Sequence, residues 1–299
     1  MSKSTWNTKN IPDQSNKVIV ITGASSGLGK EAIRVLAQKN ARIIMAVRNV
    51  EKGEAVASEI RTDFPAANIH VHPLDLGSLK SIKSFSENFT NSFDHLDILI
   101  NNAGVMACPY SKTEDGFEIQ MGTNHLGHFA LTGQLMPLLK STKHSRLVVT
   151  SSVAHRQGNI DFGDLNWEKR KYKTGKAYGD SKLANLYFAY ELAKRQSENT
   201  YAPTVTIAHP GWTKTNLDRH SGLFQFLGNI VAQTVQMGTL PSLRAAIDNN
   251  AKSGDYFGPS RRMELRGHPI LVQSNKLSHD SEKAKKLWEM SEKLTGVKY

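Results

Sequence analysis

The sequence contains a single cysteine, Cys108, among 299 residues. One thiol excludes an intramolecular disulfide bond and any metal site built from clustered cysteines. The eleven histidines show no H-E-x-x-H or comparable ligand spacing, so we expect no metal ion. A lone cysteine also fits a reducing compartment, and we expect a cytoplasmic protein.

Long apolar runs are absent as well. No stretch reaches the roughly 18 consecutive apolar residues that suggest a transmembrane helix, so we expect no membrane span. Residues 1–16 are polar and lack the apolar core of a signal peptide. We interpret them as a tail before a single domain over residues 17–299, because no repeat or low-complexity tract marks another boundary. Both a monomer and a homo-oligomer are compatible with this organisation.

Acidic residues are fewer than basic ones, 27 against 38, which gives a net charge of +11. Such a charge would suit a polyanion partner. The basic residues are dispersed, however, apart from a group at 169–176 and a smaller one at 261–266, and no nucleic-acid-binding signature accompanies them. We therefore interpret the net positive charge as a property that keeps the protein soluble and locally favours phosphate groups, and we expect no nucleic-acid partner.

Apolar runs of strand length alternate with helical patterns along the chain. The β-branched run Lys17–Thr22 is typical of a strand buried on both faces of a parallel sheet. Further strands are expected at 41–47, 68–72, 95–100, 146–150, 203–208 and 254–259, the last as an edge strand, and helices at 30–40, 50–62, 79–89, 113–140, around Tyr178 and at 278–296. This order predicts an α/β fold: a single-domain Rossmann fold with a doubly wound, mostly parallel sheet flanked by helices.

A glycine-rich turn follows the first predicted strand and precedes the first predicted helix. A glycine cluster alone indicates only a tight turn, but between a strand and a helix it lets a dinucleotide pyrophosphate approach the backbone and the helix N-terminus. The candidate cofactor-binding residues of this turn are Gly23, Ser25, Ser26, Gly27, Leu28 and Gly29.

A tyrosine and a lysine four residues apart, Tyr178 and Lys182, fall within a helical pattern and would share one face. A neighbouring ammonium group favours the phenolate and makes tyrosine a usable general acid or base. Chance pairs of this kind are common, and most are a half-buried tyrosine beside a solvated lysine. A serine pair at the end of the 146–150 strand, Ser151 and Ser152, adds a hydroxyl that could hold the reacting oxygen.

In this order the motifs resemble the short-chain dehydrogenase/reductase family: T-G-x-x-x-G-x-G from Thr22, N-N-A-G at 101–104, the serine pair, and Y-x-x-x-K. S-S-x-A-H and A-Y-x-x-S-K-L-A-N are similar to the branch of retinol dehydrogenases and their WW-domain relatives. The resemblance spans about Lys17–Pro259. It implies Asn124, Ser152, Tyr178 and Lys182 as catalytic residues, with Asn124 bonding backbone at a helix distortion and holding a relay water.

The resemblance also implies cofactor contacts beyond the glycine turn. Asp75 would contact the adenine amino group, Leu76 would form a wall, and Lys182 would hold the nicotinamide ribose beside Tyr178. From the residues alone, Asp75 begins the helix around 79–89. The remaining implied contacts are Asn102, Ala103 and Gly104 under the ribose, Pro210 and Gly211 under the nicotinamide, and Thr213 or Thr215 on its carboxamide or on the phosphates.

Arg48 follows the second predicted strand, where an acidic residue would bind the ribose hydroxyls of NAD and an arginine suits the 2′-phosphate of NADP. We therefore expect NADP(H) to be preferred over NAD(H), with Lys30 as a further phosphate contact. A solvated loop charge is the alternative for Arg48.

Two segments frame the predicted site. Residues 156–176 form a basic insertion between Ser152 and Tyr178, expected as a loop beside the site. Residues 212–245 are expected to be a substrate lid, because the segment 221–240 is apolar and uncharged with Leu223, Leu227 and Ile230 at helical spacing. A membrane-surface helix and a subunit contact remain alternatives for 221–240, although the absence of Lys and Arg disfavours the former.

The combined hypothesis is an NADP(H)-preferring oxidoreductase that interconverts an alcohol and a carbonyl on a small hydrophobic substrate. Tyr178 acts as its general acid/base. A non-catalytic NADP(H)-binding regulatory protein is the alternative hypothesis. A polyanion-binding protein is a third hypothesis, which only the net charge supports.

Overall fold

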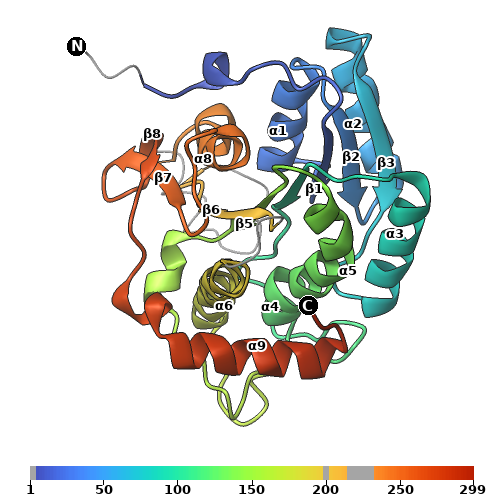
Figure 1. Ribbon diagram of the computed structural model, residues 1–299. Helices are drawn as coiled ribbons and strands as arrows, with labels where there is room; N and C mark the ends of the chain where they lie inside the picture. The colour runs from blue at the N-terminus through green and yellow to red at the C-terminus, as the bar shows by residue number, and fades with distance from the viewer. Residues whose placement is uncertain (1–4, 198–201, 214–231) are drawn as a thin grey trace.

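The computed structural model describes residues 5–197, 202–213 and 232–299. One eight-stranded sheet lies at its centre, in the order β3-β2-β1-β4-β5-β6-β7-β8 (Figure 1). The strands are β1 (Val18–Thr22), β2 (Arg42–Val47), β3 (Asn68–Pro73), β4 (Ile98–Asn101), β5 (Arg146–Thr150), β6 (Thr204–Ala208), β7 (Tyr256–Arg261) and β8 (Arg266–Leu271). All pairs are parallel except β7 with β8. The predicted doubly wound, mostly parallel sheet is confirmed.

Helices cover both faces of the sheet. Those described are α1 (Gly27–Ala37), α2 (Val50–Asp63), α3 (Leu79–Ser92), α4 (Ile119–Met121), α5 (Gly127–Ser141), α6 (Thr174–Arg195), α8 (Val235–Ile247) and α9 (Ser281–Thr295). Short helical turns are η1 (Thr8–Asn10), the π-helix η2 (Gly122–Leu126), η3 (Val153–Gln157) and η5 (Lys276–His279). Helices α1, α2 and α8 lie on one face and α3, α5 and α6 on the other, with α9 packed outside α6 (Figure 1).

The continuous apolar run of β1 is explained by these two helical layers. Val18 and Val20 enter the core under α3, α5 and α6, whereas Ile19 and Ile21 enter the core under α1, α2 and α8. Each fully buried side chain of this kind stabilises the fold by about 1.5–3 kcal/mol. The strand therefore cannot show the polar alternation of a half-exposed sheet.

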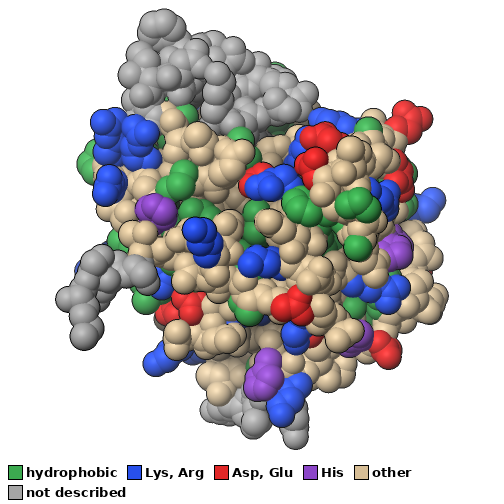
Figure 2. All heavy atoms as spheres, turned by 90° about the horizontal axis from the view of Figure 1, so that it is seen from above, with side chains coloured by type: hydrophobic (Ala, Val, Ile, Leu, Met, Phe, Trp, Pro, Cys, Tyr) green, Lys and Arg blue, Asp and Glu red, His purple; other side chains and the backbone are tan. Residues whose placement is uncertain are grey.

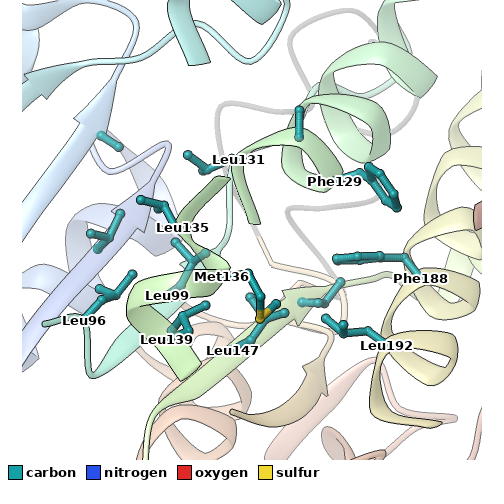
Figure 3. Packing of buried hydrophobic residues seen from close by; sticks show 14 of the residues in the cluster. Leu96, Leu99, Phe129, Leu131, Leu135, Met136, Leu139, Leu147, Phe188 and Leu192 are labelled. Atoms are coloured by element: carbon teal, nitrogen blue, oxygen red, sulfur yellow. The ribbon is translucent and has the colours of Figure 1, made fainter. Parts of the chain in front are cut away.

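Helix α5 anchors the sheet beneath the predicted active site. Leu131, Leu135 and Leu139 recur every four residues and lie in one buried cluster with Leu99 of β4 and Leu147 of β5 (Figure 3). Figure 3 also places side chains of α6, among them Phe188 and Leu192, in the same cluster. Helices α5 and α6 are thus fixed to the strands whose ends carry the predicted catalytic residues.

The prediction of 254–259 as an edge strand was wrong. Strand β7 pairs with β6 on one side and with β8 on the other, and β8 is the antiparallel edge. Strand β8 was missed because Gly267 and Pro269 interrupt its apolar pattern, and proline is tolerated at a sheet edge.

The N-terminal segment is attached to the domain from residue 5 onward. Ile11 is 1% exposed in the core under α1, and the Gln14 backbone N–H donates to the Lys39 carbonyl at 2.7 Å. The Trp6 carbonyl lies 3.2 Å from Nδ1 of His268 on β8. Figure 1 shows the segment crossing from β8 to α1, so the described part of the predicted polar tail, residues 5–16, packs against the domain.

Within the described ranges, no helix combines the length and apolarity needed to cross a bilayer. The same ranges contain no group of three or more His, Cys, Asp or Glu side chains that could hold a metal ion.

Candidate active site

The predicted motifs meet at the carboxyl edge of the sheet. Gly23 follows β1, Asn102 follows β4, Ser152 follows β5 and Pro210 follows β6. These strands are neighbours in the sheet, and β1 and β4 flank the point where the strand order reverses. Open α/β sheets bind their ligands at this point.

The glycine turn is built by close backbone approach. Gly23 has φ +68°, and a Cβ there would lie 2.8 Å from Cα of Ala103. A Cβ at Gly29 would lie 2.6 Å from the Gly23 carbonyl oxygen and 2.8 Å from Nδ2 of Asn102. Both positions require glycine, because any side chain would push the end of β1 away from the end of β4.

Thr22 ties these two strand ends together. Its Oγ1 accepts the backbone N–H groups of Asn102 and Ala103, each at 2.9 Å, and its carbonyl accepts from Nδ2 of Asn102 at 2.8 Å. With its lone pairs occupied, the Thr22 hydroxyl donates its proton to Nε2 of His128, 2.9 Å away.

His128 carries this hydrogen-bond chain into the helix below. Because Nε2 accepts from Thr22, Nδ1 holds the ring proton and donates to the Asn124 carbonyl at 3.0 Å. Burial lowers the pKa of His128 to about 4, so the ring is neutral. No sequence motif identified His128, although it is a polar residue one turn after Asn124 in an apolar helical pattern.

Asn124 lies in the π-helix η2, between α4 and α5, within the helix predicted over 113–140, whose helical part begins only at Ile119. Its Oδ1 accepts the Val105 N–H at 2.8 Å, and its Nδ2 donates to the Val105 carbonyl and to Oγ of Ser181, each at 2.9 Å. The predicted distortion and backbone contact are both present. π-Bulges of this kind are frequent at functional sites.

The two serines after β5 have different surroundings. Ser151 is buried and donates to the Lys182 carbonyl at 2.9 Å, which fixes the end of β5 to α6. Ser152 is half-buried, and its Oγ accepts the Ala154 N–H at 3.2 Å; no described residue accepts its proton. Ser152 is therefore the serine that can meet a substrate oxygen.

Tyr178 and Lys182 share one face of α6, as their spacing predicted. The Lys182 ammonium nitrogen lies 5.7 Å from the centre of the Tyr178 ring. Lys182 is 4% exposed, whereas Tyr178 is half-buried. Burial lowers the pKa of Lys182 from 10.5 to about 8, so the ammonium form still prevails at neutral pH. A charge held in this way can stabilise a phenolate beside it.

His155, from the S-S-x-A-H motif, fixes the Ser152 backbone. The Asn275 N–H donates to Nε2 of His155 at 3.3 Å, so Nδ1 holds the proton and donates to the Ser152 carbonyl at 2.6 Å. Burial lowers the pKa of His155 to about 4. The chain segment before α9 is thereby joined to the turn that carries the candidate catalytic serine.

Three features fit a nicotinamide dinucleotide. Ser26 makes no side-chain cap bond at the start of α1, unlike the N-cap residues of α2, α3, α8 and α9, so backbone N–H groups remain for a pyrophosphate. Within the described chain, the Lys182 ammonium has one hydrogen-bond acceptor, the Thr150 carbonyl at 3.3 Å, and can serve ribose hydroxyls. Arg48 is exposed and makes no ion pair with a described acid.

Four other residues predicted to contact the cofactor also have contacts within the protein. Asp75 Oδ1 accepts the Gly77 N–H at 2.8 Å, and Leu76 is buried in the core. The Thr213 hydroxyl donates to the Pro210 carbonyl at 2.8 Å. Lys30, predicted as a second phosphate contact, forms an ion pair with the Glu59 carboxylate at 2.6 Å. The Asp75 and Thr213 bonds are local turn contacts, whereas the Glu59 partner of Lys30 lies 29 residues away and has no local sequence signal.

The basic insertion 156–176 folds onto α6. Arg170 lies 3.2 Å from the Asp164 carboxylate and 3.7 Å above the Trp167 ring, and Lys176 lies 2.7 Å from the buried Asp180 carboxylate. These cations neutralise buried acids of the same chain. The insertion therefore forms a packed wall beside the N-terminus of α6.

Most of the apolar segment 221–240 lies outside the described residues, as does Thr215. The predicted lid cannot include 235–245, because α8 packs with its Leu243 and Ala245 in the core beneath α1.

Comparison with known proteins agrees with this geometry. A family model described as short chain dehydrogenase matches residues 17–224. Human retinol dehydrogenase 12 is 44% identical over 288 residues, which are 95% of this chain and 87% of that protein. Human retinol dehydrogenase 13 is 40% identical over 292 residues, with 94% of this chain and 85% of that protein covered.

Solved structures share the fold. The crystal structure of an uncharacterised protein from Mycobacterium paratuberculosis has a TM-score of 0.84 and 39% identity, and 99% of each chain is covered. A short chain dehydrogenase from Shigella flexneri complexed with NADP has a TM-score of 0.65 and 27% identity, covering 81% of this chain and 96% of that one. The chain therefore belongs to the short-chain dehydrogenase family of nicotinamide-dependent oxidoreductases that interconvert alcohols and carbonyl compounds, and within it to the branch of the retinol dehydrogenases.

Proposed function

We propose that the protein is an NADP(H)-preferring oxidoreductase in which Tyr178 is the general acid/base for a small hydrophobic alcohol or carbonyl compound. The observation that carries this proposal is the buried Lys182 ammonium beside the half-buried Tyr178 ring, on a helix that is hydrogen-bonded to the end of β5, where Ser152 follows. Burial of a charge at this depth costs folding free energy, so its presence here favours a functional role over a structural one. Perturbed groups of this kind cluster at active sites.

Each side chain has a role in the proposed reaction. Bound nicotinamide supplies or accepts the hydride at the substrate carbon. Ser152 donates a hydrogen bond to the substrate oxygen. Tyr178 gives its phenolic proton to a carbonyl or takes the proton of an alcohol, and Lys182 stabilises the phenolate that results. Asn124, held by Val105 and Ser181, keeps the π-helix in place for a water relay to Lys182.

NADP(H) preference rests on Arg48, which stands at the end of β2 where an acid would select NAD. The Shigella relative complexed with NADP supports this choice. Gly23 to Gly29 would hold the pyrophosphate, and Pro210 with Gly211 would lie under the nicotinamide.

The hydrophobic substrate is inferred from two sources: relatives that carry the name retinol dehydrogenase, and the uncharged apolar segment 221–240. We further propose a cytoplasmic location on the basis of the single cysteine. Fractionation of cells that express the chain tests the location.

The test of function is a screen of apolar aldehydes, ketones and alcohols, followed by NADPH absorbance, with the same panel run on NADH. We expect NADPH-dependent reduction of apolar carbonyls and a lower Michaelis constant for NADPH than for NADH. Tight NADPH binding without turnover of any compound would instead favour the regulatory protein.

A polyanion-binding role has less support. Figure 2 shows Lys and Arg side chains spread among Asp and Glu side chains on the face it displays, without one continuous basic surface. A steep salt dependence of binding to nucleic acid would be needed to favour it.

A further inference from the structure

The turn between β7 and β8 has an unusual backbone. Arg262, Met263 and Glu264 have φ values of +50°, +52° and +65°, although none of them is glycine. Three consecutive left-handed residues are unfavourable, and such conformations persist only where the surrounding structure enforces them. This turn lies beyond the segment that carries the family motifs.

The turn holds the residues that follow β6. The Leu265 carbonyl accepts the Trp212 N–H at 2.9 Å, and a Cβ at Gly211 would lie 2.5 Å from that same carbonyl oxygen. Oε2 of Glu264 lies 3.0 Å from Nε2 of His209, whose side chain is fully buried. The strained hairpin is thus fitted against the Pro210–Gly211 turn at several points.

The hydrogen bonds fix the tautomer of His209. The Gly211 backbone N–H can only donate, and it points at Nδ1 of His209 over 3.2 Å, so Nδ1 is the acceptor. The ring proton therefore resides on Nε2 and is donated to Glu264. Burial lowers the pKa of His209, although its hydrogen bond to Glu264 opposes this effect, and the neutral ring is the form that Gly211 requires.

The Glu264 carboxylate also forms an ion pair with the turn that follows Ser152. Oε1 of Glu264 lies 2.7 Å from the Arg156 guanidinium, which belongs to η3 directly after Ser152. Burial alone would raise the pKa of Glu264, but the hydrogen bonds from His209 and Arg156 and the positive charge of Arg156 lower it. One ionised carboxylate therefore joins the turn after β6 to the turn after β5.

We propose that Glu264 is a positioning residue, which aligns the Pro210–Gly211 turn with Ser152 through His209 and Arg156. The inference rests on the proposed function, in which that turn lies under the nicotinamide. Loss of the carboxylate would release one end of the cofactor site while leaving the adenosine end, at β1 and β2, untouched.

The test is Glu264→Gln, which keeps the side-chain size and removes the charge. We expect kcat with NADPH to fall about tenfold or more, because small misplacements of reacting groups are costly. The Kd for adenosine 2′,5′-bisphosphate, which probes the adenosine end alone, should stay within twofold of wild type. A purely structural role would lower the melting temperature and weaken both readouts together.

Two further variants complete the design. Arg156→Gln removes the other end of the ion pair at an exposed side chain and should also lower kcat. The effects of Arg156→Gln and Glu264→Gln on kcat should not add in the double variant. If Glu264→Gln fails to fold, the kcat of Arg156→Gln tests the inference in its place. Arg262→Gln, an exposed charge in the same turn, should leave kcat unchanged. If Glu264→Gln and Arg156→Gln both keep the wild-type kcat, the inference is overturned and the proposed function stands. If the wild-type protein shows no turnover with NADPH, both the proposed function and the inference are overturned.

Discussion

The two ends of the candidate site are built in different ways. At the ends of β1 and β4, Thr22, Gly23 and Asn102 meet through backbone contact and neutral hydrogen bonds. At the ends of β5 and β6, ionisable side chains set the geometry: Lys182 is buried beside Tyr178, and Glu264 joins His209 to Arg156. The first end depends on shape and the second on charge.

The difference follows from what each end has to do. A pyrophosphate needs backbone N–H groups and space, which glycines at close quarters provide. Proton transfer needs groups whose protonation is held by their surroundings. Changes of volume should therefore damage the first end, and changes of charge the second.

Removing the charge at Lys182 should have the largest effect. Lys182→Met keeps the aliphatic chain and should lower kcat by about 10²–10⁴-fold, the range typical of lost acid/base assistance. Steady-state kinetics with NADPH measures the loss, and near-normal turnover would contradict the role of the charge.

The same variant should be more stable than wild type at neutral pH. The pKa of Lys182 is lowered from 10.5 to about 8, so the unfolded chain binds more protons between these pH values and wild-type stability rises with pH across that window. Below pH 8, the buried Lys182 charge lowers the free energy of unfolding of the wild type by its full amount, about 3 kcal/mol. Urea unfolding at pH 7 and above pH 10 should therefore show an advantage for Lys182→Met that shrinks as pH rises.

Adding volume at the other end should have the next largest effect. Gly23→Val places a branched side chain at φ +68° against Ala103, and we expect cofactor affinity to fall by at least about 100-fold, more than 2.7 kcal/mol. Gly175→Ala is the matched control, because nothing lies within 4 Å of a Cβ there. Fluorescence titration with NADPH measures both, and equal affinities would refute the account of the glycine turn.

Replacing Arg48 should change selectivity rather than chemistry. Arg48→Ala removes the proposed 2′-phosphate contact, a charge-assisted bond of about 1.5–3 kcal/mol. The ratio of kcat/KM for NADPH over NADH should therefore drop by about 10–100-fold with little change in the NADH values. An unchanged ratio would mean that Arg48 is a solvated loop charge.

The smallest effect is expected at His128, which links the two ends. His128→Phe leaves the Thr22 hydroxyl and the Asn124 carbonyl without their partner, and we expect kcat to fall about tenfold. His125→Phe is the control: His125 is also buried, but it contacts Ser291 of α9. It should lower the free energy of unfolding and leave kcat near wild type.

The comparison of the two ends also explains what the sequence could predict. The glycine turn and the Tyr178 and Lys182 spacing are local patterns, and the structure places both as expected. The distant partners of His128, His209 and Glu264 lie 106, 55 and 108 residues away in the chain, and no local pattern identifies them. Strand β8 was not predicted for a related reason: it is a strand because it pairs with β7, and its own composition does not indicate one.

The most direct test of the central claim is Tyr178→Phe, which removes one hydroxyl and keeps the ring beside Lys182. The account predicts that turnover of the best carbonyl substrate is lost while the Kd for NADPH, measured by fluorescence titration, stays within a few-fold of wild type. Near-normal turnover in Tyr178→Phe would contradict the account.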